Sequence, residues 1–244
     1  MKQVAIITGA SRGIGAAIAQ RLAKDGFAVV VNYAGNAAEA DKVVGAIAAA
    51  GGSAIAVQAD VSRADDVRRL FEHSIAQLGR VDVLVNNAGI MPPHLPQLAA
   101  TDDDTFDRLL AINLKGSFNT MREAATRLER GGRIINFSSS LVGTLLPGYS
   151  AYVATKAGVE AMTAILAKEL RGKNITVNAV APGPTATALF LNGKTPEQVE
   201  HLAKMTPLER LGQPEDIAGA VSFLAGPDGG WINGQTLRAN GGMV

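Results

Sequence analysis

Near its start the chain reads Val4-Ala5-Ile6-Ile7-Thr8-Gly9-Ala10-Ser11-Arg12-Gly13-Ile14-Gly15. Residues 4–8 are apolar and rich in β-branched side chains, which predicts a buried strand. The glycines that follow permit a tight turn, and the pattern over residues 14–25, closed by Gly26, predicts a helix. The N-terminus of a helix placed after such a turn attracts a pyrophosphate. The spacing G-x-x-x-G-x-G therefore predicts a nucleotide-binding turn, with a turn that binds nothing as the alternative.

The same alternation of short apolar runs and longer helical patterns continues along the chain. Further strands are expected at residues 28–32, 53–59, 81–85, 133–137, 175–181 and 235–239. Helices are expected at residues 37–50, from an N-cap at Ser62 to residue 78, at 102–128, from the region of Tyr152 to 170, at 196–204 and at 214–225. Near-continuous apolar strands separated by helices predict an α/β fold, in which a doubly wound, seven-stranded parallel sheet carries helices on both faces. Such a sheet binds its ligands beyond the carboxyl ends of the strands.

The composition narrows the class of protein. The 244 residues, 47% of them hydrophobic, can form one core, and no linker or repeat interrupts the pattern, so residues 1–244 are expected to be a single domain. A net charge of +1 without long basic runs argues against a nucleic-acid partner. The apolar runs are of strand length, so neither a membrane span nor a signal peptide is expected, and the protein is predicted to be cytoplasmic.

Residue types that bind metals or act as thiols are sparse. The chain has no cysteine, which excludes disulfides, thiol catalysis and zinc–thiolate sites and fits a reducing compartment. The three histidines, at positions 73, 94 and 201, show no ligand spacing. No catalytic metal is therefore expected.

Tyr152 and Lys156 are the first candidates for chemistry. They are four residues apart, so a helix places both side chains on one face, one turn apart. A phenol has an ordinary pKa of about 10, and a nearby ammonium favours the phenolate and lowers that pKa. The pair could therefore give or take a proton at a reacting oxygen. The alternative is a half-buried tyrosine beside a solvated lysine, which is common on helices.

The end of the second predicted strand discriminates between nicotinamide cofactors. An acidic residue at this point would hold the ribose 2′-hydroxyl of NAD. The chain instead reads Asn32-Tyr33-Ala34, with no acid before Glu39, and Arg12 in the glycine turn lies within plausible reach of a 2′-phosphate. A guanidinium binds a phosphate that a carboxylate would repel, so NADP(H) is predicted. The alternative is that Arg12 only points to solvent.

Two further polar motifs follow predicted strands. Asp60-Val61 comes after the third strand, where the carboxylate could accept from an adenine amino group or only cap the next helix. Asn87-Ala88-Gly89 comes after the fourth strand, and its small residues would let a nucleoside lie against the backbone. A plain polar turn is the alternative.

Together these motifs resemble the short-chain dehydrogenase/reductase family. The resemblance covers nearly the whole chain and rests on a set of residues that occur in order: Thr8-Gly9, Gly13, Gly15, Asp60, Asn87-Ala88-Gly89, Asn113, Ser139, Tyr152, Lys156 and Pro182-Gly183. Each piece is weak alone, whereas the set is highly specific. The resemblance implies a single-domain Rossmann fold. It also implies a homodimer or homotetramer.

The resemblance implies roles for individual residues. Tyr152 would be the general acid in reduction, and Lys156 would bind the nicotinamide ribose and lower the Tyr152 pKa. Ser139, thirteen residues before Tyr152, would bind the substrate carbonyl, with Ser138 and Ser140 as alternatives one residue away. Asn113 would hold a water in a proton relay to Lys156. The cofactor would contact Gly9, Ser11, Arg12, Gly13, Ile14, Gly15, Asn32, Tyr33, Ala34, Asp60, Val61, Asn87, Ala88, Gly89, Tyr152, Lys156, Pro182, Gly183, Thr185 and Thr187.

The expected reaction is NADPH-dependent reduction of a neutral, largely apolar ketone or aldehyde. The candidate substrate wall is apolar, and its members are Met91, Leu95, Leu141, Leu145, Leu146, Phe190 and Leu191. A 3-oxoacyl thioester on acyl carrier protein is an alternative, for which Arg127, Arg130 and Lys173 could form a docking surface. Enoyl-thioester reduction is disfavoured, because relatives with that chemistry separate Tyr and Lys by more residues. A dinucleotide sensor without turnover is the alternative outside enzymes.

Overall fold

The computed structural model of the protein describes residues 2–92 and 94–244. Its centre is a seven-stranded sheet with the order β3-β2-β1-β4-β5-β6-β7, in which every neighbouring pair is parallel. The strands are β1 (Val4–Ile7), β2 (Ala28–Tyr33), β3 (Ser53–Gln58), β4 (Val83–Asn86), β5 (Arg133–Phe137), β6 (Thr176–Pro182) and β7 (Thr236–Ala239). This confirms the predicted doubly wound sheet. The strand order reverses between β1 and β4, and ligands of such sheets bind at this switch point.

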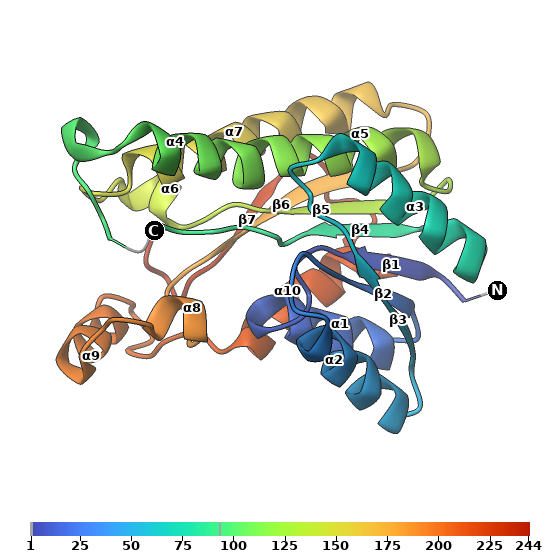
Figure 1. Cartoon of the computed structure of the whole chain (residues 1–244), viewed down its shortest axis with the longest axis horizontal. Helices are drawn as coiled ribbons and strands as arrows, with labels where there is room; N and C mark the ends of the chain where they lie inside the picture. Colours follow the sequence, from blue (N-terminus) through green and yellow to red (C-terminus); the bar gives the residue numbers. More distant parts are fainter. Residues whose placement is uncertain (1, 93) are drawn as a thin grey trace.

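Helices cover both faces of the sheet (Figure 1). One face carries α1 (Gly13–Lys24), α2 (Ala37–Ala49) and α10 (Pro214–Ala225), and the other carries α3 (Ala64–Leu78), α5 (Gly116–Arg127) and α7 (Ser150–Glu169). The remaining helical elements are η1 (Leu98–Ala100), α4 (Asp103–Leu109), η2 (Leu110–Lys115), α6 (Leu141–Thr144), α8 (Ala188–Leu191), α9 (Pro196–Lys204) and η3 (Pro227–Gly229).

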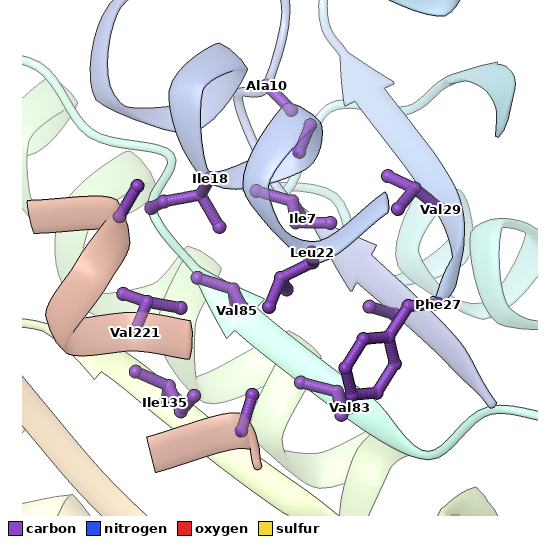
Figure 2. Packing of buried hydrophobic residues seen from close by; sticks show 14 of the residues in the cluster. Ile7, Ala10, Ile18, Leu22, Phe27, Val29, Val83, Val85, Ile135 and Val221 are labelled. Atoms are coloured by element: carbon purple, nitrogen blue, oxygen red, sulfur yellow. The ribbon is translucent and has the colours of Figure 1, made fainter. Parts of the chain in front are cut away.

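The hydrophobic core consists of two clusters, one on each face of the sheet, because successive side chains of a strand point to opposite faces. Ile7 of β1 packs with α1 and α10 around Ile18 and Val221 (Figure 2), whereas its neighbour Ile6 lies in the cluster of α3, α5 and α7. Burial of each such side chain stabilises the fold by about 1.5–3 kcal/mol. The carboxyl end of β1, from which the glycine turn departs, is thereby fixed from both faces.

The predicted helix over residues 102–128 is wrong in one respect. Its middle, Leu110–Lys115, is π-helical and separates α4 from α5. Single π turns inside α-helices occur frequently at functional sites.

The predicted N-cap at Ser62 is also wrong. Helix α3 begins at Ala64, and Arg63 occupies the N-cap position without a side-chain cap bond. The Ser62 hydroxyl instead donates to Oδ1 of Asp60 at 2.7 Å. This local bond competes with capping of the helix, so Ser62 does not serve as the N-cap.

Among the described residues, no helix combines the length and apolar character needed to cross a membrane. Within the same residues, no three His, Asp or Glu side chains gather into a group that could hold a metal ion.

Candidate active site

The glycine turn between β1 and α1 requires its glycines. Gly9 and Gly13 adopt φ angles of +61° and +56°, in the left-handed region that disfavours other residues. A Cβ on Gly9 would lie 2.9 Å from the Cα of Ala88, and one on Gly15 would lie 2.5 Å from Nδ2 of Asn87. The turn therefore lies directly against the segment that follows β4.

Hydrogen bonds hold these two segments together. Nδ2 of Asn87 donates to the carbonyl oxygens of Thr8 and Gly9 at 2.9 and 3.1 Å. The backbone N–H of Ala88 donates to Oγ1 of Thr8 at 3.0 Å. The Asn87-Ala88 motif thus braces the glycine turn.

Asn32 also braces the turn from within. Its side chain is buried, with Oδ1 accepting from the backbone N–H of Gly9 at 3.2 Å. Its Nδ2 donates to the carbonyls of Val57 and Ala59 at 3.2 and 3.1 Å. The side-chain amide of Asn32, which the sequence analysis placed among the cofactor contacts, therefore makes its hydrogen bonds within the protein. It supports the cofactor site by fixing the glycine turn.

The rim beyond β2 has Arg12 in the adjoining glycine turn and no acid at residues 34–38. Arg12 is exposed at the N-cap of α1, and Ala34 is exposed while Tyr33 is partly buried. The first acid after β2 is Glu39, which pairs with Lys42 at 2.6 Å. This rim favours an anionic group over a hydroxyl that needs an acceptor.

Asp60 makes a local turn that leaves one oxygen available. Its Oδ1 accepts from both the N–H and the hydroxyl of Ser62, at 2.9 and 2.7 Å. Its Oδ2 has no hydrogen-bond partner among residues 2–92 and 94–244. Val61 is buried against Gly116, where a Cβ would lie 2.7 Å from Cγ2 of Val61.

Tyr152, Ser139 and Lys156 come together where β5 meets α7. The side chain of Ser139 lies beside the Tyr152 hydroxyl, close enough to act on the Tyr152 pKa through hydrogen bonding. Nζ of Lys156 donates to the carbonyl of Phe137 at 2.9 Å and lies 5.7 Å from the centroid of the Tyr152 ring. Lys156 is 5% exposed and also borders Gly89, where an added Cβ would lie 3.5 Å from Nζ.

The three consecutive serines after β5 have different partners. Ser138 donates its hydroxyl to Oε1 of Glu160 at 2.6 Å. Ser140 donates to the carbonyl of Ala181 at 3.1 Å and accepts from Nδ2 of Asn240 at 2.9 Å. The Ser139 hydroxyl accepts from the N–H of Leu141 at 3.2 Å, and Ser139 is the serine of this group whose hydrogen bonding acts on the pKa of Tyr152.

Burial shifts the pKa values of Tyr152 and Lys156 in opposite directions. Desolvation raises the pKa of Tyr152 to about 12, and the hydrogen bond from Ser139 acts against this rise. Desolvation lowers the pKa of Lys156 to about 8. Burial is the largest influence on the Tyr152 pKa in this structure, where the ammonium lies over the ring, and the expected lowering of that pKa by Lys156 stays a prediction. The phenol stays protonated at neutral pH.

Asn113 lies in the π-helical segment and is fully buried. Its Oδ1 accepts from the N–H of Ile90 at 2.8 Å, and its Nδ2 donates to the carbonyl of Ile90 at 2.9 Å and to Oγ1 of Thr155 at 3.4 Å. The side chain therefore joins the loop after β4 to α7, with Lys156 one residue from Thr155.

The segment after β6 completes the site. A Cβ on Gly183 would lie 2.8 Å from the Cα of Asn240, so this turn also needs a glycine. Thr185 is buried and donates to the carbonyl of Gly183 at 3.0 Å. Thr187 caps α8, and its Cγ2 lies 3.6 Å from the Cβ position of Gly13, which brings the segment over the glycine turn.

Two surface hollows differ in their relation to these residues. A groove of about 310 Å³ lies beside Tyr149 and Val153, and its lining includes Leu145 and Leu146 of the predicted apolar wall. A cleft of about 640 Å³ lies at the amino ends of β1, β4 and β5 and is lined by none of the predicted site residues.

Comparison with known proteins places the chain in a family. A family model described as enoyl-(acyl carrier protein) reductase matches residues 9–244. A short-chain type dehydrogenase/reductase of Picea abies is 48% identical over 99% of this chain and 92% of its own length. An NADPH-dependent aldehyde reductase-like protein of Arabidopsis thaliana is 46% identical over 99% of this chain and 94% of that protein.

Two further similarities extend the comparison. A 3-oxoacyl-[acyl-carrier-protein] reductase of Staphylococcus aureus is 44% identical over 100% of this chain and 98% of that protein. The crystal structure of a short chain dehydrogenase from Burkholderia cenocepacia in complex with NADP superimposes with a TM-score of 0.92, at 38% identity over 99% of this chain and 97% of that one. The resemblance that the motifs indicate is thereby confirmed, and the chain belongs to the short-chain dehydrogenase/reductase family.

Proposed function

We propose that this protein is an NADPH-dependent oxidoreductase that reduces a neutral, largely apolar ketone or aldehyde to the alcohol, with Tyr152 as the proton donor. The observation that carries the proposal is the placing of Ser139 beside the Tyr152 hydroxyl and of the buried ammonium of Lys156 near the Tyr152 ring, at the carboxyl end of the sheet. The similarity to the NADPH-dependent aldehyde reductase-like protein of Arabidopsis thaliana, which covers nearly the whole chain, supports both the reductase activity and the cofactor.

The residues present fit NADPH. The backbone of the turn leaves no room for a Cβ at Gly9 or Gly15, so a pyrophosphate can approach the N-terminus of α1 closely. Arg12 would take the 2′-phosphate and the free oxygen of Asp60 the adenine amino group. The other contacts would come from residues 87–89, Lys156, Pro182, Gly183, Thr185 and Thr187. When bound, the cofactor supplies a hydride for the carbonyl carbon.

The protein's own groups act on the carbonyl oxygen. The paired hydroxyls of Ser139 and Tyr152 donate to that oxygen, and such fixed donors stabilise the negative charge that develops there. Tyr152 then gives its proton to the nascent alkoxide, for which a phenol kept protonated by a pKa of about 12 is suited. Lys156, over the ring, stabilises the phenolate that remains. We assign Asn113 to the relay that returns a proton, through a water.

A groove near the start of α7, the helix that carries Tyr152, supports the proposed substrate class. The groove at Leu145, Leu146 and Tyr149 is lined mainly by apolar side chains and contains no charged residue among those described. An apolar groove without a cation favours a neutral, apolar carbonyl compound over a carboxylate or phosphate.

A 3-oxoacyl thioester on acyl carrier protein is the second candidate, favoured by the similarity to the Staphylococcus aureus reductase. The cations expected to dock that carrier are committed within the chain, however. Arg127 pairs with Glu123 at 2.7 Å, Arg130 donates to the carbonyl of Gly172 at 2.8 Å, and Lys173 donates to that of Ala125 at 2.7 Å. Each of these bonds competes with a carrier's phosphate or carboxylates.

We further propose that residues 1–244 act as one domain and assemble into a homodimer or homotetramer in the cytoplasm. Large apolar side chains remain exposed on the helices and near the C-terminus, and Trp231 is 98% exposed. Isolated chains rarely leave such surface uncovered.

The test compares the protein with Tyr152→Phe. The oxidation of NADPH and of NADH is followed with ketones, aldehydes, 3-oxoacyl thioesters and enoyl thioesters. We expect turnover with ketones or aldehydes and NADPH, and a loss of about 10²–10⁴-fold in Tyr152→Phe with unchanged NADPH affinity. Retention of most of the activity in the variant contradicts the role of Tyr152. Oxidation of neither cofactor with any carbonyl favours a sensor, and faster oxidation of NADH contradicts the cofactor assignment.

A further inference from the structure

Three consecutive residues at the end of β5 are each tied to α7. The carbonyl of Phe137 accepts from Lys156 at 2.9 Å, and the hydroxyl of Ser138 donates to Oε1 of Glu160 at 2.6 Å. Ser139 lies beside the Tyr152 hydroxyl and acts on its pKa through hydrogen bonding. Residues 152, 156 and 160 are spaced by four, so all three partners project from one face of α7.

We propose that Glu160 is a positioning residue for the reaction, which acts through Ser138 on the segment that presents the Ser139 hydroxyl and the Phe137 carbonyl. The expected effect on the reaction rate rests on the proposed function. The positioning of the segment by Glu160 does not depend on it. The bond to Glu160 lies between the contact with Lys156 and the contact with Tyr152, and it helps to hold the segment that must meet both of these groups.

The bond between Ser138 and Glu160 has the character that such a role needs. Ser138 is 3% exposed, and its hydroxyl donates to a carboxylate, a type of bond roughly twice as strong as one between neutral groups. The backbone N–H of Ser138 is already held by the carbonyl of Val180 at 2.8 Å. The bond to Glu160 therefore fixes the remaining freedom of this residue, and Ser139 follows directly in the chain.

A neighbouring bond already joins β5 to α7, so Glu160 is not needed merely to hold the strand and the helix together. Nδ2 of Asn136 donates to Oγ1 of Thr163 at 2.8 Å, and both residues are fully buried. That neutral pair already joins the strand to the helix. Glu160 is only partly buried and adds a charged acceptor one turn closer to Lys156, at the end of the strand where the site begins.

Four variants test the proposal in the full-length protein. Glu160→Ala and Ser138→Ala each remove the bond, and Glu160→Gln keeps an oxygen acceptor of the same reach. Glu169→Ala, on the exposed end of the same helix, is the matched control. Displacement of a reacting group by about 1 Å can cost about 10²-fold in rate. We therefore expect kcat to fall about 10- to 100-fold in both alanine variants, with little change in NADPH affinity.

Two comparisons separate positioning from general destabilisation. Glu160→Gln should lose clearly less of kcat than Glu160→Ala, because its amide oxygen remains an acceptor although the charge is removed. The double variant Glu160→Ala/Ser138→Ala should be no worse than either single variant, because both act through one bond. Additive losses, or an unchanged kcat in a folded Glu160→Ala protein, overturn the proposal.

Amide hydrogen exchange supplies a readout that needs neither cofactor nor substrate. The backbone N–H groups of Ser138 and Ser140 are bonded to the carbonyls of Val180 and Pro182 at 2.8 and 3.0 Å. Their exchange should accelerate in Glu160→Ala, less in Glu160→Gln, and not in Glu169→Ala. Unchanged exchange overturns the positioning itself, whereas a wild-type protein that reduces no carbonyl overturns only the proposed function.

Discussion

Burial of the Lys156 ammonium makes the stability of this protein depend on pH in the alkaline range. Burial lowers the pKa of Lys156 from 10.5 to about 8. Between these two pH values the unfolded chain holds the proton and the folded chain does not. The free energy of unfolding therefore rises with pH, because the unfolded state binds more protons. A difference of about 2.5 pKa units corresponds to about 3 kcal/mol in total.

The perturbation that isolates this effect is Lys156→Met. We expect the free energy of unfolding of wild type, measured relative to that of the variant, to increase by about 2.5 kcal/mol between pH 7 and pH 10. Other titrating groups cancel in this difference. Urea or guanidinium unfolding followed by circular dichroism gives both values at each pH, and the range stops at pH 10 because Tyr152 begins to matter above it.

The matched control is Lys168→Met, which removes a lysine from the exposed last turn of the same helix. A difference between wild type and Lys156→Met that stays constant within about 0.5 kcal/mol from pH 7 to pH 10 refutes the reasoning. It would mean that the ammonium keeps its hydration, or an equal replacement for it, inside the folded protein.

Two further outcomes follow from the glycine turn. Arg12→Ala should weaken NADPH binding about 10- to 100-fold and leave NADH binding nearly unchanged, as measured by fluorescence titration, because a charge-assisted phosphate contact of about 1.5–3 kcal/mol is lost; equal losses for both cofactors contradict a contact with the 2′-phosphate. Gly9→Ala should lower the free energy of unfolding by at least about 1–2 kcal/mol, because φ is +61° and the new Cβ would lie 2.9 Å from the Cα of Ala88. Gly45→Ala, at an exposed helix position with nothing within 4 Å of the added Cβ, is its control and should be stabilising.

The arrangement of the sheet could be predicted because its strands are short apolar runs that the chain separates by helices. The seven expected strands correspond to the observed ones with small differences at their ends. The interruption of the helix at Leu110–Lys115 could not be predicted, since its residues are ordinary helix formers. Contacts distant in sequence accompany it, such as the bonds between Asn113 and Ile90.

The sequence predicts which residues form the candidate site better than it predicts how their side chains are arranged. The spacing to Tyr152 favoured Ser139, and only the fold gives the neighbouring serines other partners. The spacing of Lys156 placed it on the same helix face as Tyr152, but spacing cannot tell whether the ammonium meets the hydroxyl or the ring. Asn32 stands where cofactors are discriminated, yet its side chain points inward, which a one-dimensional pattern does not reveal.

The π-helical turn at Leu110–Lys115 is equivalent to one residue inserted into a continuous helix. Deleting one residue there would restore regular winding and rotate the chain on one side of the deletion by about 100° relative to the other. Met121 and Ala124, which are buried against the sheet, would then turn away from the core if Asn113 kept its contacts with Ile90. The length of this segment is therefore fixed both by the contacts of Asn113 with Ile90 and by the burial of Met121 and Ala124. Insertions and deletions should be tolerated far less well here than in the loops between helices.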